Sequence, residues 1–169
     1  MEFKMTGGSI YIDNVPDFLK VLRSISSNYN TIVQAMDGSK IAGEKHLLFS
    51  IQKALRAKEN NCCMAHDLGI EIMRYASGKK QIGEAFSMGV HEGQMNVVFV
   101  VLGENTDVEL SVQELNNLIE EAPVMKYASS KRAVLIEQFS ITEEEIWAAG
   151  EEMIPSLVME RVALVDILK

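Results

Sequence analysis

The stretch Asn96–Leu102, NVVFVVL, decides the fold class of this 169-residue chain. A strand with one face in water alternates apolar and polar residues, whereas a strand buried on both faces is a continuous apolar run. Apart from its first residue, this stretch is such a run. We therefore expect a central strand buried on both faces, with helices covering both sides of its sheet.

Three further segments have the character of strands. Ser9–Asp13 shows a short apolar alternation, and Thr31–Met36 is rich in β-branched and apolar residues before a turn at Asp37-Gly38. Leu68–Tyr75 alternates loosely and leads into a turn at Ser77-Gly78. With the central run, these segments predict four strands.

Helical patterns precede, separate and follow these strands. Pro16 suits the first turn of a helix that Asn14 caps and that continues to about Ser26. The clearest pattern starts at Glu44, and its apolar stripe consists of Leu47, Leu48, Ile51, Ala54 and Leu55. A short amphipathic helix from Ile82 should stop at Gly89.

From about Ser111 onward the pattern is helical. Thr142 and Glu145 have the spacing of a capping box. The apolar stripe of the last helix contains Ile154, Leu157, Val158, Val162, Val165 and Leu168. We expect a mixed α/β or α+β fold with a helical C-terminal third, in one domain over residues 1–169.

The formal charge of −8 argues against a general nucleic-acid binder, because non-specific affinity for phosphates depends on many lysines and arginines. Any contact with RNA must be local. No segment approaches the ~20 apolar residues of a bilayer span, and the N-terminus lacks the apolar core of a secretory signal. These features predict a cytoplasmic protein without membrane contact.

The motifs of several enzyme classes are missing from the sequence. It contains no GxxxxGK[ST] or GxGxxG phosphate-binding loop, no HExxH and no GxSxG. Cys62, Cys63 and His66 could supply zinc ligands, but the second pair of a tetrahedral site is absent, and a plain pair of buried thiols near a helix end fits better. We expect no metal site at these residues.

The strongest local group of functional residues is Arg74–Gln81, RYASGKKQ, where a strand is expected to end and a helix to begin. Backbone N–H groups at a helix N-terminus attract anions, and Gly78 would allow a phosphate or base to approach. Tyr75 could stack on a base, and Ser77 or Gln81 could bond a base edge. The alternative is an ordinary solvated turn whose lysines aid solubility.

Two further features each allow two interpretations. His46, near the start of the helix from Glu44, could join the basic site or serve as a packed or capping residue. The segment Ser156–Lys169 is apolar on most of its faces, so it could be core packing or a docking element for a partner.

Three stretches together resemble a known family. They are Ile41–Ser50, Leu68–Phe86 and Leu157–Asp166. The chain is similar over nearly its whole length, and most weakly over Glu104–Lys131, to archaeal members of the family that includes the human PRPK-binding protein.

The resemblance implies a mixed α/β fold with an antiparallel sheet clad in helices and with no metal or cofactor. It also implies a subunit without catalytic residues in KEOPS, the complex that installs threonylcarbamoyl-adenosine in tRNA. Such a subunit binds and regulates the kinase-like ATPase, captures the single-stranded CCA end of tRNA, and contacts the threonylcarbamoyl-transferase only indirectly. The family's RNA-end site corresponds to Arg74, Ser77, Gly78, Lys79, Lys80 and Gln81, with Lys45 and His46 as neighbours. We place the partner surface on Leu157, Glu160, Ala163 and Leu164; Cys62 and Cys63 receive no role.

Two alternatives to this adaptor remain open. One is a small enzyme or binding module for a phosphorylated metabolite, with residues 76–81 as its phosphate cradle and His46 or Glu71 as the general base. The other is a purely structural scaffold.

Overall fold

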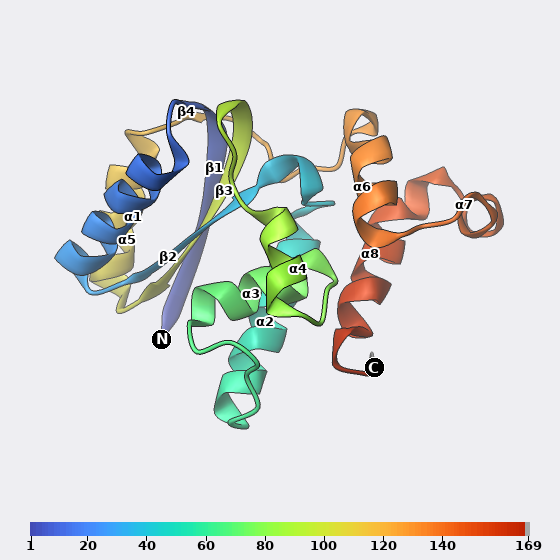
Figure 1. Cartoon of the computed structure of the whole chain (residues 1–169), viewed down its shortest axis with the longest axis horizontal. Helices are drawn as coiled ribbons and strands as arrows, with labels where there is room; N and C mark the ends of the chain where they lie inside the picture. Colours follow the sequence, from blue (N-terminus) through green and yellow to red (C-terminus); the bar gives the residue numbers. More distant parts are fainter. Residues whose placement is uncertain (168–169) are drawn as a thin grey trace. The chain divides into compact units, whose positions relative to one another are not determined.

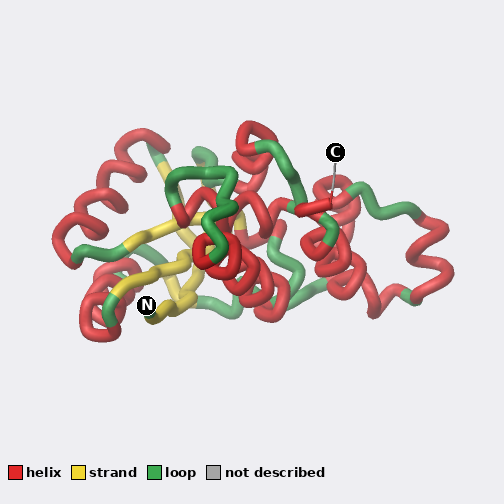
Figure 2. Tube along the Cα trace, turned by 90° about the horizontal axis from the view of Figure 1, so that it is seen from below, coloured by secondary structure: helices red, strands yellow, loops and turns green. Residues whose placement is uncertain are grey.

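The chain folds into two compact units, which the computed structural model describes over residues 1–167. Unit 1 combines Met1–Gly38 with Gly89–Val124, and unit 2 combines Ser39–Met88 with the segment from Met125 onward. Each unit is thus built from two separate stretches of the sequence (Figure 1). Helix predominates over strand along the trace (Figure 2).

Unit 1 contains an antiparallel sheet whose strand order is β2-β3-β1-β4 in the described part of the chain. The central pair is β1 (Glu2–Ile12) and β3 (Gly93–Gly103), in a register that sets Phe3 opposite Leu102. The strand β2 (Ile32–Asp37) pairs with the other edge of β3. Val97–Leu102 are fully buried, which confirms the central strand that the apolar run predicts.

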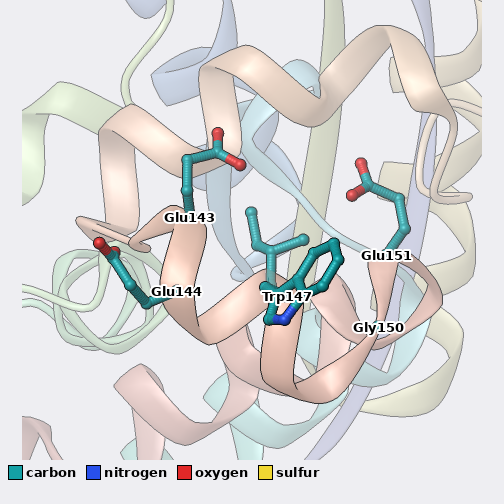
Figure 3. A pocket seen from close by; sticks show the side chains of 6 residues that line it. Glu143, Glu144, Trp147, Gly150 and Glu151 are labelled. Atoms are coloured by element: carbon teal, nitrogen blue, oxygen red, sulfur yellow. The ribbon is translucent and has the colours of Figure 1, made fainter.

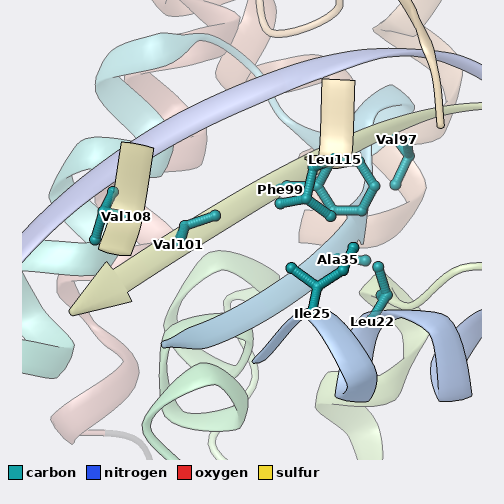
Figure 4. Close-up of a cluster of buried hydrophobic side chains, with 8 residues drawn as sticks. All are labelled: Leu22, Ile25, Ala35, Val97, Phe99, Val101, Val108 and Leu115. Carbon is teal, nitrogen blue, oxygen red and sulfur yellow. The ribbon is translucent and has the colours of Figure 1, made fainter. Parts of the chain in front are cut away.

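Helices α1 (Val15–Tyr29) and α5 (Asn105–Asn116) cover one face of this sheet (Figures 1 and 4). Alternate residues of β3 point into their core, as a side-chain period of two requires. The cluster consists of Leu22, Ile25, Ala35, Val97, Phe99, Val101, Val108 and Leu115. The side chain of Asn14 accepts the N–H of Asp17, so the predicted cap of α1 is confirmed.

The fourth strand is not the one that the sequence suggested. It is β4 (Glu120–Glu121), a two-residue strand that pairs with Gly8 and Ser9 of β1. A Cβ atom at Gly8 would lie 2.1 Å from the carbonyl oxygen of Glu120. Only glycine therefore lets the two backbones approach this closely.

Unit 2 is helical in the residues that the structure describes. Its first stretch holds α2 (Glu44–Glu59), α3 (Leu68–Ser77) and the single turn α4 (Ile82–Ala85). Its second stretch holds α6 (Arg132–Phe139), α7 (Glu143–Ala149) and α8 (Ile154–Ala163). The core between α6, α7 and α8 contains Ala42, Leu135, Phe139, Ile141, Ile146, Ile154 and Val158.

The strand predicted for Leu68–Tyr75 is wrong, because this segment forms α3. Asp67 caps the helix by accepting the N–H of Ile70, and Gly78 ends it in the left-handed conformation. Nearly every residue between them is buried, so the helix has no polar face. Its sequence nevertheless carries a helical period, because the polar residues Glu71, Arg74 and Ser77 recur three positions apart, although the fold buries all three.

The predictions for the C-terminal third are confirmed with one change. Thr142 and Glu145 form a capping box at α7, but β4 and a loop separate α5 from α6. On the predicted stripe of the last helix, Ile154, Val158, Val162 and Val165 are buried; Leu168 lies outside the described residues. No helix within residues 1–167 combines the length and the apolar character of a bilayer span. The mixed α+β class with a four-stranded antiparallel sheet is confirmed.

Candidate nucleic-acid interface

The segment Arg74–Gln81 lies at the C-terminal end of α3, not at the end of a strand. The carbonyl end of a helix carries a negative partial charge, and α4, which follows, is a single turn, so the expected helix N-terminus for an anion is not built here. Gly78 has a φ of 69°, and a Cβ on it would lie 2.9 Å from the ring of Phe139. Glycine is required at this position for two reasons: the helix ends here in the left-handed conformation, and the ring of Phe139 occupies the space that a Cβ would need.

Arg74 belongs to a buried ion pair. Its side chain is 2% exposed, and its Nε donates to Oε1 of the fully buried Glu71. The other carboxylate oxygen of Glu71 accepts the N–H groups of Met64, at 2.6 Å, and Ala65. The pair therefore anchors the loop before α3 to the helix itself.

The remaining nitrogens of Arg74 also face partners within the chain. One donates to the carbonyl oxygen of Lys80 at 3.2 Å, and the other lies 4.0 Å from the carboxylate of Asp166. The guanidinium lies 4.6 Å from the ring centroid of Tyr75, whose hydroxyl donates to Asp166. Burial and the Asp166 carboxylate raise the pKa of Tyr75. In this conformation Arg74 and Tyr75 serve the fold, and their polar groups are not presented to RNA.

Ser77 and His46 have internal roles as well. The Ser77 hydroxyl donates to the carbonyl of Arg74 and accepts the N–H of Lys79. His46 is 1% exposed; its Nδ1 accepts the N–H of Ala42, so its Nε2 carries the hydrogen and donates to the carbonyl of Ala76 at 2.9 Å. Burial lowers the pKa of His46 to about 4. Of its two interpretations, the structure matches the packed histidine that joins α2 to α3.

The other residues of the expected RNA site are accessible. Gln81 and Lys45 are exposed, and Lys79 and Lys80 are half-buried. Because the neighbouring His46 bonds to Ala76, the first turn of α2, with Lys45, lies beside the last turn of α3. The structure thus gathers three lysines from two distant stretches in one region of unit 2.

A pocket of about 340 Å³ opens beside this group. It is lined by Lys40, Lys79, Val134, Glu137 and Gln138. The ammonium of Lys40 donates to the carbonyl of Ser87, and the amide of Gln138 donates to the carbonyl of Ser77. Lys40 and Gln138 could not be predicted as neighbours of Lys79, because 39 or more positions separate each of them from it and only the tertiary fold brings them together.

Neither candidate general base can act on a substrate in this conformation. Glu71 is fully buried and paired with Arg74, and both ring nitrogens of His46 are bonded within the chain. A base must reach the proton it abstracts, directly or through one water. Within residues 1–167 there is also no group of three or more potential metal ligands, and Cys62 and Cys63 are free thiols.

The expected partner surface lies on α8 and the residue that follows it. Glu160 and Ala163 are exposed, whereas Leu157 and Leu164 are half-buried, and Leu157 also packs against the core of unit 2. Arg161, on the same helix, donates to the carbonyls of Phe139 and Ser140 and to the carboxylate of Glu145. These bonds fix α8 against α6 and α7.

Comparison with known proteins identifies one family. The model of the kinase-binding protein CGI-121 family matches residues 12–166. A search of the curated proteins gives no match. The matched region spans both units and includes the lysine group and the exposed face of α8. The chain belongs to the CGI-121 family of kinase-binding proteins.

Proposed function

We propose that this chain is a non-catalytic subunit of the KEOPS complex, which modifies tRNA with threonylcarbamoyl-adenosine. In this proposal it binds and regulates the kinase-like ATPase and captures the CCA end of tRNA, in the cytoplasm and without a cofactor. The observation that carries the proposal is the family match over residues 12–166, since that family is described as a kinase-binding protein. The tRNA role rests on the resemblance of Leu68–Phe86 and on the accessible lysines.

The proposed grip for the RNA end consists of Lys45, Lys79, Lys80 and Gln81, together with Lys40 in the adjacent pocket. Ammonium groups bind phosphates, and a small group of them gives a local contact that the net charge of −8 would otherwise oppose. The amide of Gln81 supplies both a donor and an acceptor for a base edge. Arg74, Ser77 and His46 hold this region in shape.

The test of the RNA grip is binding of tRNA to the double variant Lys79→Glu/Lys80→Glu. We expect binding to weaken by on the order of tenfold or more, because two phosphate contacts become repulsive. Lys45→Glu should weaken it further. The matched control is Lys58→Glu, an exposed lysine in the last turn of α2 that should have little effect.

The same assay tests which part of the tRNA is bound. Removal of the CCA end should abolish most of the binding, because the recognised element is single-stranded. Equal affinity for trimmed and intact tRNA would reject capture of the CCA end. Equal affinity of the double variant and the Lys58→Glu control would reject the lysine grip.

The proposed kinase-binding face consists of Leu157, Glu160, Ala163 and Leu164. Positions 157, 160 and 164 follow one another at helical spacing, so they share a face of α8. Ala163→Arg should weaken binding of the kinase-like subunit by at least tenfold, since a long charged side chain cannot fit a packed interface. Ser24→Arg on α1, also exposed, is the control, and equal losses in both variants would contradict this placement.

A further inference from the structure

Trp147 is the only tryptophan in the chain, and its side chain is 92% exposed. It lies on α7, where the neighbouring Ile146 packs into the core of unit 2 instead. A fully exposed indole contributes little to folding, whereas tryptophan is among the residues most enriched at the centres of protein interfaces. The exposure of Trp147 therefore indicates that its side chain binds a ligand.

A pocket of about 550 Å³ accompanies this indole. It is lined by Glu143, Glu144, Ile146, Trp147, Gly150 and Glu151. Figure 3 shows the indole between the carboxylates of Glu143 and Glu144 on one side and that of Glu151 on the other. An aromatic plane bordered by carboxylates is the arrangement that binds organic cations, through the ring face and through charge-assisted hydrogen bonds.

The charge around the pocket is strongly negative. Residues 143–152, EEEIWAAGEE, contain five glutamates and no cation. Arg132 on α6 pairs with Glu143 and Glu151, and Arg161 pairs with Glu145. For Glu144 the described residues provide no ion-pair partner, so the rim keeps an excess of negative charge.

The contacts of Arg132 link the two sides of the pocket. Its guanidinium joins the start of α7, at Glu143, to the 3₁₀ turn Glu151–Met153 that follows Gly150. Gly150 has a φ of 102°, a conformation that favours glycine. Arg132 thus leaves Glu144 as the carboxylate of the rim that is available to a ligand.

We propose that this surface, Glu143–Glu151 with Trp147 at its centre, is a docking site for an arginine-bearing segment of a partner protein. The guanidinium stacks on the indole and donates to the carboxylate of Glu144. Charge complementarity selects this occupant: phosphate backbones and acidic segments are repelled, and an apolar segment would cover the carboxylate of Glu144 without giving it a partner. The residues that line this pocket include none of the lysines of the RNA grip and none of the four residues of the expected face on α8.

The single tryptophan makes the site directly observable. The full chain is titrated with a short peptide that carries two arginines among glycines, while the fluorescence of Trp147 is recorded. We expect a saturable change in emission. The affinity derived from it should fall several-fold when the salt concentration is raised from about 0.05 M to about 0.5 M, because salt screens exposed charges. A peptide with citrulline in place of arginine has the same shape without the charge and should not bind.

Two variants separate the contributions of the site. Glu144→Gln should weaken binding of the arginine peptide by about fivefold, the effect of removing one exposed ion pair. Trp147→Ala should abolish saturable binding of a dye-labelled arginine peptide, measured by anisotropy, and should leave the thermal unfolding midpoint unchanged. The control Glu109→Gln, on α5 of unit 1, removes the same charge and should leave the affinity unchanged.

Three results would overturn the proposal. They are the absence of a saturable change with the arginine peptide, equal binding of the citrulline peptide, and unaltered affinity of Trp147→Ala. None of these outcomes depends on the kinase-like partner or on tRNA, so the failure of this inference is distinguishable from the failure of the proposed function.

Discussion

Arg74 illustrates how a basic residue in a promising motif can serve the fold. It stands six residues before Lys80, yet its guanidinium lies against Glu71, Tyr75 and the carbonyl of Lys80. A buried ion pair is far costlier to break than a surface pair, because removing one partner leaves an uncompensated buried charge.

Arg74→Ala should therefore lower the free energy of unfolding by about 3–5 kcal/mol, measured by urea denaturation. Lys79→Ala, five residues further along, should change it by no more than about 0.5 kcal/mol, because its side chain is partly exposed. A loss below about 1 kcal/mol for Arg74→Ala would show that Glu71 finds other compensation. Because variants of Arg74 are expected to be destabilised, a loss of tRNA binding in them would not by itself show that Arg74 contacts RNA.

His46 gives a prediction about pH. Its pKa is about 4 in the folded chain against 6.5 in the unfolded chain, so on acidification the unfolded state takes up the proton first. The stability that the neutral ring contributes is complete above pH 6.5 and is lost as the pH falls from there to about 4. The free energy of unfolding should fall by roughly 3 kcal/mol through this group.

The measurement for His46 compares the chain with His46→Gln, whose amide can replace both ring hydrogen bonds but does not titrate. The unfolding free energy of the unaltered chain should fall relative to that of the variant between pH 7 and pH 4, since other groups titrate alike in both. A difference that stays constant between pH 7 and pH 4 would contradict a buried neutral histidine.

At the level of elements, α3 shows where prediction from the sequence fails. Leu68, Ile70 and Ile72 alternate with other residues as in a strand, and this alternation competes with the helical spacing of Glu71, Arg74 and Ser77. The ends of the helix carry two further signals, the cap at Asp67 and the glycine at Gly78. By contrast, β3 was predictable from its unbroken apolar run, and α1 and α2 from apolar residues at helical spacing.

The end of α3 can be tested with two glycines in adjacent elements. Gly78→Ala should lower the free energy of unfolding by about 1–2 kcal/mol or more, because the left-handed conformation disfavours a Cβ and this Cβ would meet Phe139. Gly83→Ala in α4 meets nothing within 4 Å and should be neutral or stabilising by up to about 1 kcal/mol. Similar effects of both changes in thermal or urea unfolding would contradict this description.

The candidate RNA site was predictable only in part. The sequence placed the lysines Lys79 and Lys80 in a turn, and the structure leaves both accessible. It could not reveal that Arg74, Ser77 and His46 are buried, because partners such as Asp166, which pairs with Arg74, and Ala76, which bonds to His46, are set by the tertiary fold. The pocket lined by Lys40 could not be predicted from the sequence for the same reason.

At the scale of the whole molecule, both compact units are discontinuous in sequence. The chain leaves unit 1 after Gly38, returns at Gly89 and leaves again after Val124. Since neither unit can be excised as one stretch, we expect residues 1–169 to unfold as one domain. Native-state hydrogen exchange should give the same maximal free energy of opening for β3 of unit 1 and α2 of unit 2, and values more than about 2 kcal/mol apart would contradict a single domain.

The central claim is that this chain is an adaptor between a kinase-like ATPase and the end of tRNA. The most direct measurement is the molar mass, by light scattering after size exclusion, of a mixture of this chain, the kinase-like subunit of the same cell and tRNA. We expect one species that contains all three. The variant Ala163→Arg should no longer bind the kinase-like subunit, and Lys79→Glu/Lys80→Glu should no longer bind tRNA. Elution of the unaltered chain alone in the presence of both would contradict the adaptor role.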